Sequence, residues 1–293
     1  MRTITSIPET TAAVEAARSA GKPVGFVPTM GFLHQGHVSL VRESRLKAGL
    51  TVVSIFVNPL QFGPKEDFKE YPRDPVRDSN LLEHEGVDIL FCPEAADMYP
   101  PGFKTSVEVR DLQDKLCGAS RPGHFRGVCT VVLKLFDIVR PDFAFFGQKD
   151  AQQAVILKRL TADLNLQVTI EVCPIVREAD GLAMSSRNIY LSPKERRAAL
   201  VLSRSLEAAR QGYLAGERRT TVLLERMSAL IYKEPLARVD YLAAVSPETL
   251  EPAANVEDEV LFALAVFIGR TRLIDNALLG SFASPGAKNR PRL

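Results

Sequence analysis

The alternation of short apolar runs with helical patterns in the first half of the chain constrains the fold more than any other feature. The apolar runs cover residues 24–29, 50–57, 87–92, 143–146 and 168–172. Such uninterrupted runs are typical of strands buried on both faces of a parallel sheet, and their alternation with helices favours a doubly wound α/β fold. Because ligands of such sheets bind beyond the carboxyl ends of the strands, the residues that follow each run are the first candidates for a functional site.

Helical patterns fill the connections between these runs. The segment 128–139 places its apolar residues at helical spacing on one face, and similar patterns cover 38–47, 75–85 and 150–164. The order of strands and helices therefore predicts a Rossmann-like domain over residues 1–175.

The sequence changes in character after about Pro174. The pair Ser192–Pro193 is typical of a helix start, and a surface-like helical sequence follows it. Strand patterns come next, at 238–245, 259–268 and 271–279. We therefore predict a second, smaller α+β domain over residues 176–293, and its last stretch, 284–293, has a composition typical of disorder.

The composition indicates a globular protein and narrows its class. The formal net charge of +2 gives no general case for nucleic-acid or membrane binding. The scattered cysteines are typical of a reduced protein rather than of a disulfide framework. They are Cys92, Cys117, Cys129 and Cys173. The first residues lack the apolar core of a signal peptide and no stretch is apolar enough to span a bilayer, so we expect a cytoplasmic protein.

Eight residues after the first apolar run carry the strongest functional signal. They are Met30, Gly31, Phe32, Leu33, His34, Gln35, Gly36 and His37. A helix is predicted to begin at about Val38, and a helix N-terminus offers unpaired N–H groups and a partial positive charge to a phosphate. The glycines allow a ligand to approach the backbone closely, and the imidazoles can donate hydrogen bonds to phosphate oxygens. The pattern therefore predicts a site for nucleotide phosphates.

Zinc binding is the alternative function for His34 and His37. A zinc site needs at least a third protein ligand. The other histidines, His84 and His124, are distant in sequence, and the chain has no Cys-x-x-Cys pair. The local sequence therefore favours phosphate over zinc.

Polar residues also follow two further apolar runs. Asn58 and Gln61 carry neutral amides, which suit a hydroxyl, a carboxylate or an amide better than a bare phosphate; the alternative is a simple turn. Lys149 can add a positive charge for a polyphosphate at a helix start, where Asp150 is predicted to be the N-cap. Gln153 is expected one turn further, facing the same ligand; the alternative for this segment is a capped surface helix.

Three weaker candidates complete the set. Arg187, in a loop of small and hydroxylated residues, can bind two phosphate oxygens at once, or the loop is a polar linker between domains. The segment Arg121–Gly127, with two arginines and a histidine, could bind a carboxylate or phosphate or could be a surface turn. Asp78, close to the polar patch Tyr71–Asp74, is a candidate magnesium ligand.

These segments resemble known proteins at two levels. The His-x-Gly-His pattern after a first strand resembles the signature of the nucleotidylyltransferase superfamily, which includes the class I aminoacyl-tRNA synthetases. The full set resembles the pantothenate synthetase (pantoate–β-alanine ligase) family. The resemblance runs in family order through PTMGFLHQGH, FVNPLQF, EDFKEYPRD, RPGHFRGVCTVVLKL, FGQKDAQQ, VREADGLAMSSRN and, more weakly, VDYL and TRLIDN, so it covers nearly the whole chain.

The resemblance implies a two-step reaction. The carboxylate of pantoate attacks the α-phosphorus of ATP and expels pyrophosphate, and the amine of β-alanine then attacks the pantoyl adenylate and expels AMP. The resemblance also implies Mg²⁺ beside ATP, a homodimer, a nucleotide- and pantoate-binding domain over 1–175 and a lid domain over 176–293.

The resemblance further implies a role for individual residues. His34, His37, Lys149 and Arg187 are implied as catalytic, with His37 as proton donor and Arg187 as the charge-stabilising group of a closing loop. Contacts with ATP are implied for Met30 to His37 and for Gly147, Gln148, Lys149, Asp150, Val176, Met184, Ser185, Ser186 and Arg187. Pantoate contacts are implied for Gln61, Gln153 and Asn58, and a β-alanine contact for Gln61.

Two other functions stay open at this point. One is a nucleotidyltransferase that stops after adenylyl or cytidylyl transfer, and the other is a non-catalytic nucleotide sensor. Gln61 and Gln153 favour the ligase, because a phosphorylated acceptor would call for more cations beside it. A sensor would not need the full set of phosphate contacts.

Overall fold

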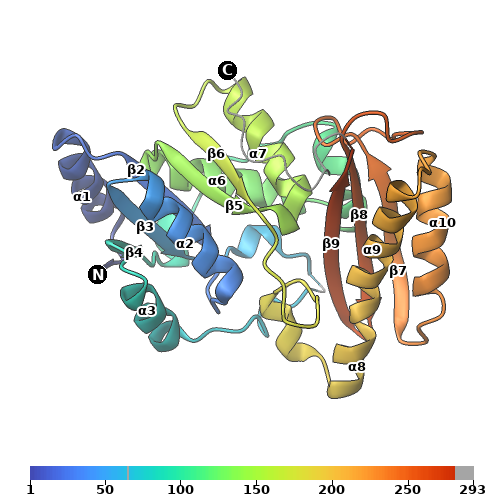
Figure 1. Cartoon of the computed structure of the whole chain (residues 1–293). Helices are drawn as coiled ribbons and strands as arrows, with labels where there is room; N and C mark the ends of the chain where they lie inside the picture. Colours follow the sequence, from blue (N-terminus) through green and yellow to red (C-terminus); the bar gives the residue numbers. More distant parts are fainter. Residues whose placement is uncertain (65, 281–293) are drawn as a thin grey trace. The chain divides into compact units, whose positions relative to one another are not determined.

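The computed structural model describes residues 1–64 and 66–280, and the chain divides into two compact units (Figure 1). The first unit consists of residues 1–176 together with 184–186. The second consists of 177–183 together with the residues from 187 onward. The stretch 284–293, for which the sequence predicts disorder, lies outside the described residues.

The first unit is built on a six-stranded sheet in the order β1–β4–β3–β2–β5–β6, and all its paired strands are parallel. The strands are β1 (Arg2–Ile4), β2 (Val24–Thr29), β3 (Leu50–Ile55), β4 (Ile89–Phe91), β5 (Phe143–Gly147) and β6 (Thr169–Cys173). β2 pairs with β3 on one side and with β5 on the other, so the direction of winding reverses between β2 and β5. Ligands of doubly wound sheets bind at such a switch point, which the segments after β2 and β5 flank.

Helices connect these strands and lie on both sides of the sheet (Figure 1). They are α1 (Ile7–Ser19), α2 (Gln35–Lys47), α3 (Pro75–His84), α4 (Ala95–Met98), α5 (Cys117–Ser120), α6 (His124–Val139) and α7 (Ala151–Asp163). Short 3-10 turns occur at η1 (Pro59–Gln61), η2 (Leu112–Asp114), η3 (Gln148–Asp150) and η4 (Ser186–Tyr190).

Both faces of the sheet are covered by apolar side chains of these helices. On one face, Leu40 and Val41 of α2 and Leu82 of α3 form a buried cluster with side chains of the strands. On the other face, the ring of Phe26 in β2 meets that of Phe136 in α6 edge to face, with centroids 6.4 Å apart. Because neither face of the inner strands β2, β3, β4 and β5 is open to water, these strands need no polar alternation, which is why their apolar runs identified them.

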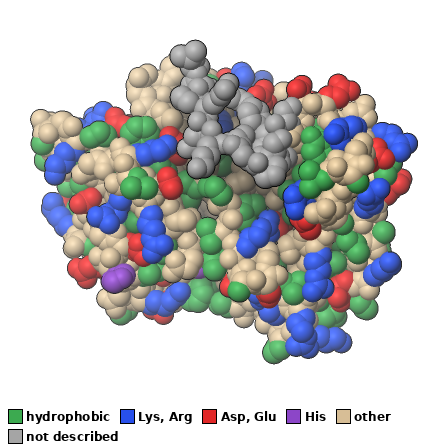
Figure 2. All heavy atoms as spheres, viewed as in Figure 1, with side chains coloured by type: hydrophobic (Ala, Val, Ile, Leu, Met, Phe, Trp, Pro, Cys, Tyr) green, Lys and Arg blue, Asp and Glu red, His purple; other side chains and the backbone are tan. Residues whose placement is uncertain are grey.

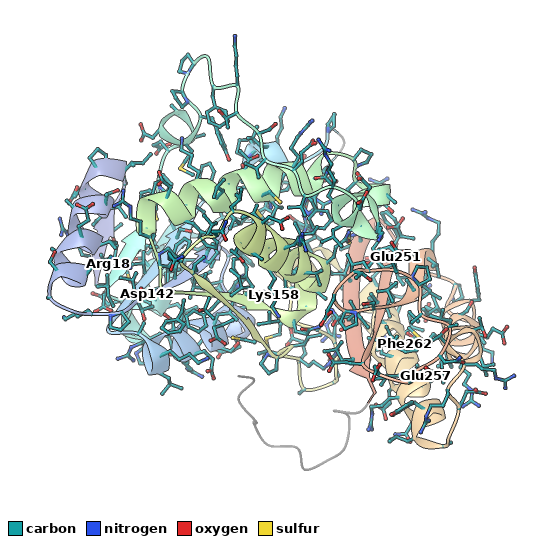
Figure 3. The ribbon with its side chains drawn as sticks, turned by 90° about the horizontal axis from the view of Figure 1, so that it is seen from above. Arg18, Asp142, Lys158, Glu251, Glu257 and Phe262 are labelled. Atoms are coloured by element: carbon teal, nitrogen blue, oxygen red, sulfur yellow. The ribbon has the colours of Figure 1, made fainter. Side chains whose placement is uncertain are left out.

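One carboxylate ties α1 to the central strands. Arg18 of α1 and Asp142, just before β5, lie side by side in Figure 3. The Arg18 guanidinium donates to both Asp142 oxygens at 3.2 Å and to the Arg140 carbonyl oxygen at 2.7 Å. Asp142 also accepts the Val24 N–H at 2.7 Å, so it fixes the start of β2 as well.

Up to residue 280, the second unit contains a three-stranded antiparallel sheet in the order β7–β8–β9 and three helices. Its elements are α8 (Pro193–Ala198), α9 (Leu200–Leu214), α10 (Thr220–Ile231), β7 (Ala237–Val245), β8 (Val260–Ile268) and β9 (Thr271–Leu279). Leu206 of α9, Met227 of α10 and Phe262 of β8 belong to its buried core. Ser192 caps α8 in a reciprocal capping box with Glu195, at the helix start that the sequence predicted.

The predicted fold class is confirmed: a doubly wound parallel sheet is accompanied by a smaller α+β unit. The structure also contains β1 and α1, which the prediction omitted, and α2 begins at Gln35 rather than near Val38. Within the described ranges, none of the helices combines the length and apolar character that crossing a membrane requires. Figure 2 shows both basic and acidic side chains spread over the viewed face, in line with 37 Lys and Arg against 35 Asp and Glu.

Candidate active site

The segment Met30–His37, which we call the histidine loop, joins the carboxyl end of β2 to α2. Gly31 has a φ of 83° and Phe32 a φ of 49°, so two successive residues adopt left-handed backbone conformations. This conformation is strained for a residue with a Cβ, so contacts from elsewhere in the fold must hold Phe32 in place.

Those contacts come from α3. Asp78 accepts the N–H of Phe32 at 2.6 Å and that of Leu33 at 2.8 Å, and its side chain is buried. Burial raises the pKa of Asp78, and the two N–H groups oppose that rise. Arg77 donates to the Leu33 carbonyl oxygen at 2.7 Å, and its guanidinium lies 4.9 Å from the centroid of the Phe32 ring. α3 therefore holds the histidine loop through both N–H and C=O groups.

This geometry gives Asp78 a structural task, and its predicted role at a magnesium ion stays a prediction. Each carboxylate oxygen accepts a backbone N–H of the histidine loop. In the described part of the chain, no group of three or more His, Cys, Asp or Glu side chains is arranged to hold a metal ion. The surroundings of Asp78 therefore favour a structural role, and the zinc interpretation of His34 and His37 gains no third ligand from residues 1–64 and 66–280.

His34 and His37 form a reciprocal cap at the start of α2. His34 Nδ1 accepts the Gly36 N–H at 3.1 Å, and His37 Nδ1 accepts the His34 N–H at 3.3 Å. The two ring centroids lie 4.1 Å apart. A ring nitrogen that accepts a hydrogen bond carries no proton, so each neutral imidazole holds its proton on Nε2. The pair therefore provides two Nε2–H donors at a helix N-terminus.

Both imidazoles are uncharged at neutral pH. Burial, followed by the charge of Lys149, lowers the pKa of His34 to about 4. Burial also lowers the pKa of His37 well below 6.5, and the neighbouring His34 and Lys149 act in the same direction. Lys149 follows β5, whereas the two histidines follow β2. The effect of its charge on their pKa values therefore reflects the closeness of these two segments at the switch point.

Lys149 lies in the turn η3, which precedes α7. Its side chain is 21% exposed, and its Nζ lies 3.7 Å from the Asp150 carboxylate. Asp150 lies at the N-cap position of α7, as predicted, but its side chain makes no capping hydrogen bond. The charge of Asp150 instead opposes the lowering of the His34 pKa, so it partly offsets the field of Lys149.

Two neighbouring glutamines on α7 differ in their surroundings. Gln152 is buried, and its amide accepts the Cys117 N–H at 2.9 Å and donates to the carbonyl oxygens of Leu112 and Lys115 at 2.9 and 2.7 Å. Gln153 is only half-buried. Gln152 is thus committed to the fold, and the predicted ligand contact of Gln153 stays a proposal.

The residues after β3 form what we call the amide turn, Asn58–Gln61. Asn58 is 1% exposed, and its amide is hydrogen bonded on both sides. Its Oδ1 accepts the Tyr99 hydroxyl at 2.7 Å and a backbone N–H of the turn at 3.2 Å. Its Nδ2 donates to the Gly127 carbonyl oxygen at 3.1 Å and to Gln61 Oε1 at 3.0 Å.

This network gives Asn58 a role in the fold itself. Because both ends of its amide bind the chain, Asn58 orients Gln61, and its predicted contact with pantoate stays a prediction. With Oε1 directed to Asn58, Gln61 turns Nε2 toward Met30 and donates to its Sδ at 3.0 Å. A thioether sulfur is a weak acceptor, so the Gln61 donor faces the start of the histidine loop without a strong partner there.

The segment Arg121–Gly127 binds a carboxylate that belongs to the chain. Arg121 donates two hydrogen bonds to Glu66, at 2.7 and 2.6 Å, and its Nη1 lies 3.0 Å from His124 Nε2. His124 Nδ1 lies 2.8 Å from the Gln61 carbonyl oxygen. Although burial raises the pKa of Glu66, the hydrogen bonds and charge of Arg121 lower it overall.

The segment 184–186 belongs to the first unit and contacts the histidine loop. Ser186 Oγ donates to the Phe32 carbonyl oxygen at 3.1 Å. The Met184 N–H donates to the Val176 carbonyl oxygen at 3.0 Å. Residues predicted to close over the phosphates are therefore connected directly to the loop that is predicted to bind them.

The first unit thus brings together three of the four residues predicted to be catalytic: His34, His37 and Lys149. Arg187 belongs to the second unit, so its approach to the phosphates stays a prediction. Within that unit, Arg177 pairs with the buried Asp275 through hydrogen bonds of 2.7 and 2.9 Å and so fixes the beginning of the same loop.

The sequence analysis missed three residues that shape the site: Arg77, Glu66 and Tyr99. Arg77 stands beside Asp78 in a predicted helix, and this acid–base pair was a signal that could have drawn attention to it. Glu66 and Tyr99 reach Arg121 and Asn58 across 55 and 41 residues of sequence. No local pattern identifies partners at that separation.

Comparisons with known proteins agree on one family. The model of the pantoate-beta-alanine ligase family matches residues 2–278. A pantothenate synthetase from Pelotomaculum thermopropionicum is 57% identical over 275 residues, which cover 94% of this chain and 98% of that protein. The crystal structure of pantothenate synthetase from Thermus thermophilus shares 46% identity and a TM-score of 0.91, covering 94% of this chain and 99% of that one.

A second solved structure is more distant in sequence. The pantoate-beta-alanine ligase from Francisella tularensis, complexed with beta-gamma ATP and beta-alanine, is 33% identical with a TM-score of 0.78. It covers 95% of this chain and 97% of its own. Because the family model, the sequence relative and both structures match over almost the whole length, the chain belongs to the pantoate–β-alanine ligase family, as its motifs predicted.

Proposed function

We propose that this chain carries out the reaction of its family with the histidine loop and the amide turn in defined roles. The family match supports the overall reaction, the ATP-dependent condensation of pantoate with β-alanine to pantothenate, AMP and pyrophosphate. The roles of single residues rest on the geometry of the first unit.

In the first step, the pantoate carboxylate attacks the α-phosphorus of ATP, and the bond to pyrophosphate breaks. The Nε2–H groups of His34 and His37 donate to phosphate oxygens, and Lys149 supplies a positive charge against the charge that builds up on pyrophosphate. Gln61 holds the pantoate carboxylate with its Nε2–H₂ group in place of the Met30 sulfur, and Gln153 contributes a second amide. Alignment of the two reactants and electrostatic stabilisation supply most of the acceleration.

The protonation of His37 follows from its surroundings. Its pKa is lowered well below 6.5, so it meets ATP as a neutral hydrogen-bond donor. A bound polyphosphate favours the imidazolium form, because an adjacent anion raises the pKa of a histidine. The added proton goes to Nδ1, so His37 releases the His34 N–H in that form. The family resemblance implies that His37 is a proton donor. His37 therefore gains that capacity only after the nucleotide has bound.

In the second step, the amine of β-alanine attacks the acyl carbon of pantoyl adenylate, and the bond to AMP breaks. An alkyl ammonium has a pKa of about 10, so this group must first lose a proton, which passes to solvent. The mixed anhydride also reacts with water, which the site must exclude. We assign that exclusion to the loop Met184–Arg187 and, more broadly, to residues 176–293 as a lid over the binding domain 1–175.

Magnesium would enter this site with the nucleotide. Mg²⁺ is commonly held by substrate phosphates with only one or two carboxylates, so a protein cage is not required. The described residues contain no such cage, and Asp78 is engaged with the histidine loop. No step above depends on a metal ligand from the chain.

We also propose a cytoplasmic homodimer. The four cysteines, all within the described residues, form no disulfide with one another, which suits a reducing compartment. The dimer is proposed from the family resemblance alone.

The observation that carries the proposal is the reciprocal histidine cap at the switch point, with the Gln61 donor turned toward the same loop. The decisive experiment is ATP–pyrophosphate exchange with pantoate in the absence of β-alanine. A carboxylate-activating ligase must show exchange under these conditions. Lack of exchange would sink the proposal and leave a nucleotidyltransferase with another acceptor, or a nucleotide sensor, as the function.

A further inference from the structure

The side chains of Glu66, Arg121 and His124 form a chain of hydrogen bonds that the reaction does not use directly. Arg121 joins Glu66 by two hydrogen bonds, of 2.7 and 2.6 Å, and meets His124 Nε2 at 3.0 Å. The Arg121 and Glu66 side chains are only 16% and 25% exposed. A semi-buried ion pair of two-bond geometry is rigid, because moving either partner leaves a charge without its counterpart.

The partners of His124 fix the position of its proton. The Gln61 carbonyl oxygen, 2.8 Å from Nδ1, can only accept a hydrogen bond, so Nδ1 must carry a proton. The Arg121 guanidinium can only donate, so Nε2 must be the acceptor. His124 is therefore a neutral imidazole in the Nδ1–H form, and Arg121 selects that tautomer.

The amide turn depends on contacts from outside itself. Its own backbone hydrogen bonds, from the N–H of Gln61 to Asn58 and from that of Phe62 to Pro59, are both long, at 3.4 Å. A Cβ built on Gly127 of α6 would lie 2.2 Å from the Leu60 carbonyl oxygen. The turn therefore rests directly on the first turns of α6, where His124 also lies.

Gln61 is thus fixed at two points. Asn58 directs its side-chain oxygen and leaves Nε2 toward Met30, while His124 holds its backbone carbonyl oxygen. The first contact sets the rotation of the amide. The second sets where the amide stands, because the peptide of Gln61 cannot shift without breaking the bond to His124.

We propose that Glu66, Arg121 and His124 are positioning residues that set the place of the Gln61 amide for the acid substrate. The proposal rests on the proposed function, in which Gln61 binds the carboxylate of pantoate. Arg121 is neutralised by Glu66, so it attracts no substrate carboxylate of its own. It acts through the tautomer of His124 and through its own longer hydrogen bond, of 3.5 Å, to the Gln61 carbonyl oxygen. Loss of His124 therefore weakens pantoate binding and leaves ATP binding unchanged.

The test compares two substitutions at His124. In His124→Asn, the amide Nδ2 can stand where Nδ1 stood and can still donate to the Gln61 carbonyl oxygen. In His124→Phe, the ring that packs edge to face on Phe125 at 4.8 Å is kept, but both nitrogens are lost. We expect His124→Phe to raise the KM for pantoate about fivefold to tenfold, the effect of one lost hydrogen bond. We expect His124→Asn to recover most of that loss, and neither variant to change the KM for ATP by more than about twofold.

Arg121→Lys extends the test to the ion pair. Lysine keeps the charge beside Glu66 but lacks the planar fork that binds Glu66 and His124 together. We expect a smaller rise in the KM for pantoate, about threefold, with the same constant KM for ATP. This variant also serves if His124→Phe does not fold.

The outcomes of these experiments distinguish failure of the positioning role from failure of the proposed function. An unchanged KM for pantoate in His124→Phe, or equal rises of the two KM values together with a lower Tm, overturns the positioning role. So does a His124→Asn variant as impaired as His124→Phe. Absence of pantoate-dependent exchange in the unmodified chain, measured first, overturns the proposed function instead.

Discussion

The histidine loop and the amide turn both follow strands of the same sheet, but they are held in different ways. The histidine loop is strained at Phe32 and is held by Asp78, whose single carboxylate accepts two backbone N–H groups. The amide turn is held mainly by neutral groups. Arg121 adds one long hydrogen bond, of 3.5 Å, to the Gln61 carbonyl oxygen, and its charge is paired with that of Glu66. The histidine loop, which we call the phosphate end of the site, thus places hydrogen-bond donors in a strained backbone conformation. The amide turn with Arg121 and Glu66, which we call the acid end, carries no net charge and presents one oriented amide, that of Gln61.

This difference shows how one site can distinguish two anions. A polyphosphate carries several charges, so strained N–H and imidazole donors near Lys149 suit it. A small hydroxy acid carries one charge, and a fixed neutral amide recognises it by direction rather than by field strength. Changes at the two ends should therefore affect different substrates.

The largest effect is expected at His37. His37→Asn keeps an acceptor near the position of Nδ1 for the His34 N–H but removes the Nε2–H donor. We expect ATP–pyrophosphate exchange to fall about 10²- to 10³-fold, the loss typical of one donor to a developing negative charge. His37→Ala should lose as much activity and also the cap. The KM for pantoate should change little in both variants, and an equal loss of exchange and pantoate binding would mean that His37 is merely structural.

The next largest effect is expected at Asp78. Asp78→Asn replaces one acceptor by an NH₂ group that faces a backbone N–H, so the free energy of unfolding should fall by about 2–3 kcal/mol. The KM for ATP should rise more than that for pantoate, because the histidine loop relaxes. Urea unfolding and substrate titrations measure both quantities.

Asp74 provides the matched control on the same helix. It caps α3 by accepting the Arg77 N–H at 3.1 Å, a task that asparagine performs about equally well. Asp74→Asn should therefore change the free energy of unfolding by only about 0.5 kcal/mol or less. If Asp78→Asn is no worse than this control, α3 does not hold the loop as described.

A third substitution adds a negative charge to the neutral acid end. Gln61→Glu removes the Nε2 donor and adds a negative charge, so the KM for pantoate should rise about tenfold or more through like-charge repulsion. The KM for ATP should stay within about twofold. The exposed Gln167→Glu carries the same change in net charge and should leave both constants alone. A parallel rise for ATP would show that the two ends are not separate.

The smallest effect concerns protonation of the histidine loop. The pKa of His34 is about 4 in the folded chain against 6.5 for an ordinary histidine. Between these values the unfolded chain binds more protons, so the stability that neutral His34 contributes is complete above pH 6.5 and is lost as the pH falls toward 4. Lowering the pH from about 6.5 to about 5.5 should reduce the free energy of unfolding by about 1 kcal/mol through His34. His37, whose pKa is also lowered, adds a loss of the same sign.

His34→Asn tests this assignment, since asparagine can keep the cap without titrating. The pH dependence of the urea midpoint should be weaker in this variant than in the unmodified chain. An identical dependence in both would place the titration elsewhere. Bound ATP should also weaken the dependence in the unmodified chain, because the phosphates favour the protonated imidazole.

The sequence predicted the parts of the fold that local patterns determine. β2 was predicted from Val24 to Thr29, the limits it has, because a strand buried on both faces is an uninterrupted apolar run. β1 was missed because three residues at the sheet edge make no recognisable run. α1 was missed because only Thr10 and Val14 are buried along it, which leaves no clear apolar stripe.

The candidate site was predictable in its residue types and less so in its contacts. The histidine pair and the amides follow strand ends, so their position could be read from the chain. The roles of Asp78 and Asn58 could not, because their partners lie 46 and 69 residues away, at Phe32 and Gly127. Asp150 occupies the predicted N-cap position without a capping hydrogen bond, because it also ends the 3-10 turn η3 that precedes α7.

Gly127 carries a consequence for how this sequence can change. Any side chain there would meet the backbone of the amide turn at 2.2 Å, so the lack of a side chain is itself part of the site. Gly63, two residues beyond Gln61, would meet only ordinary contacts of 3.7 Å with Glu66. In a library randomised at both positions, selection for growth without pantothenate would admit alanine at 63 and return glycine at 127. Near the Gln61 amide, position 63 can therefore change during evolution, whereas position 127 must remain glycine.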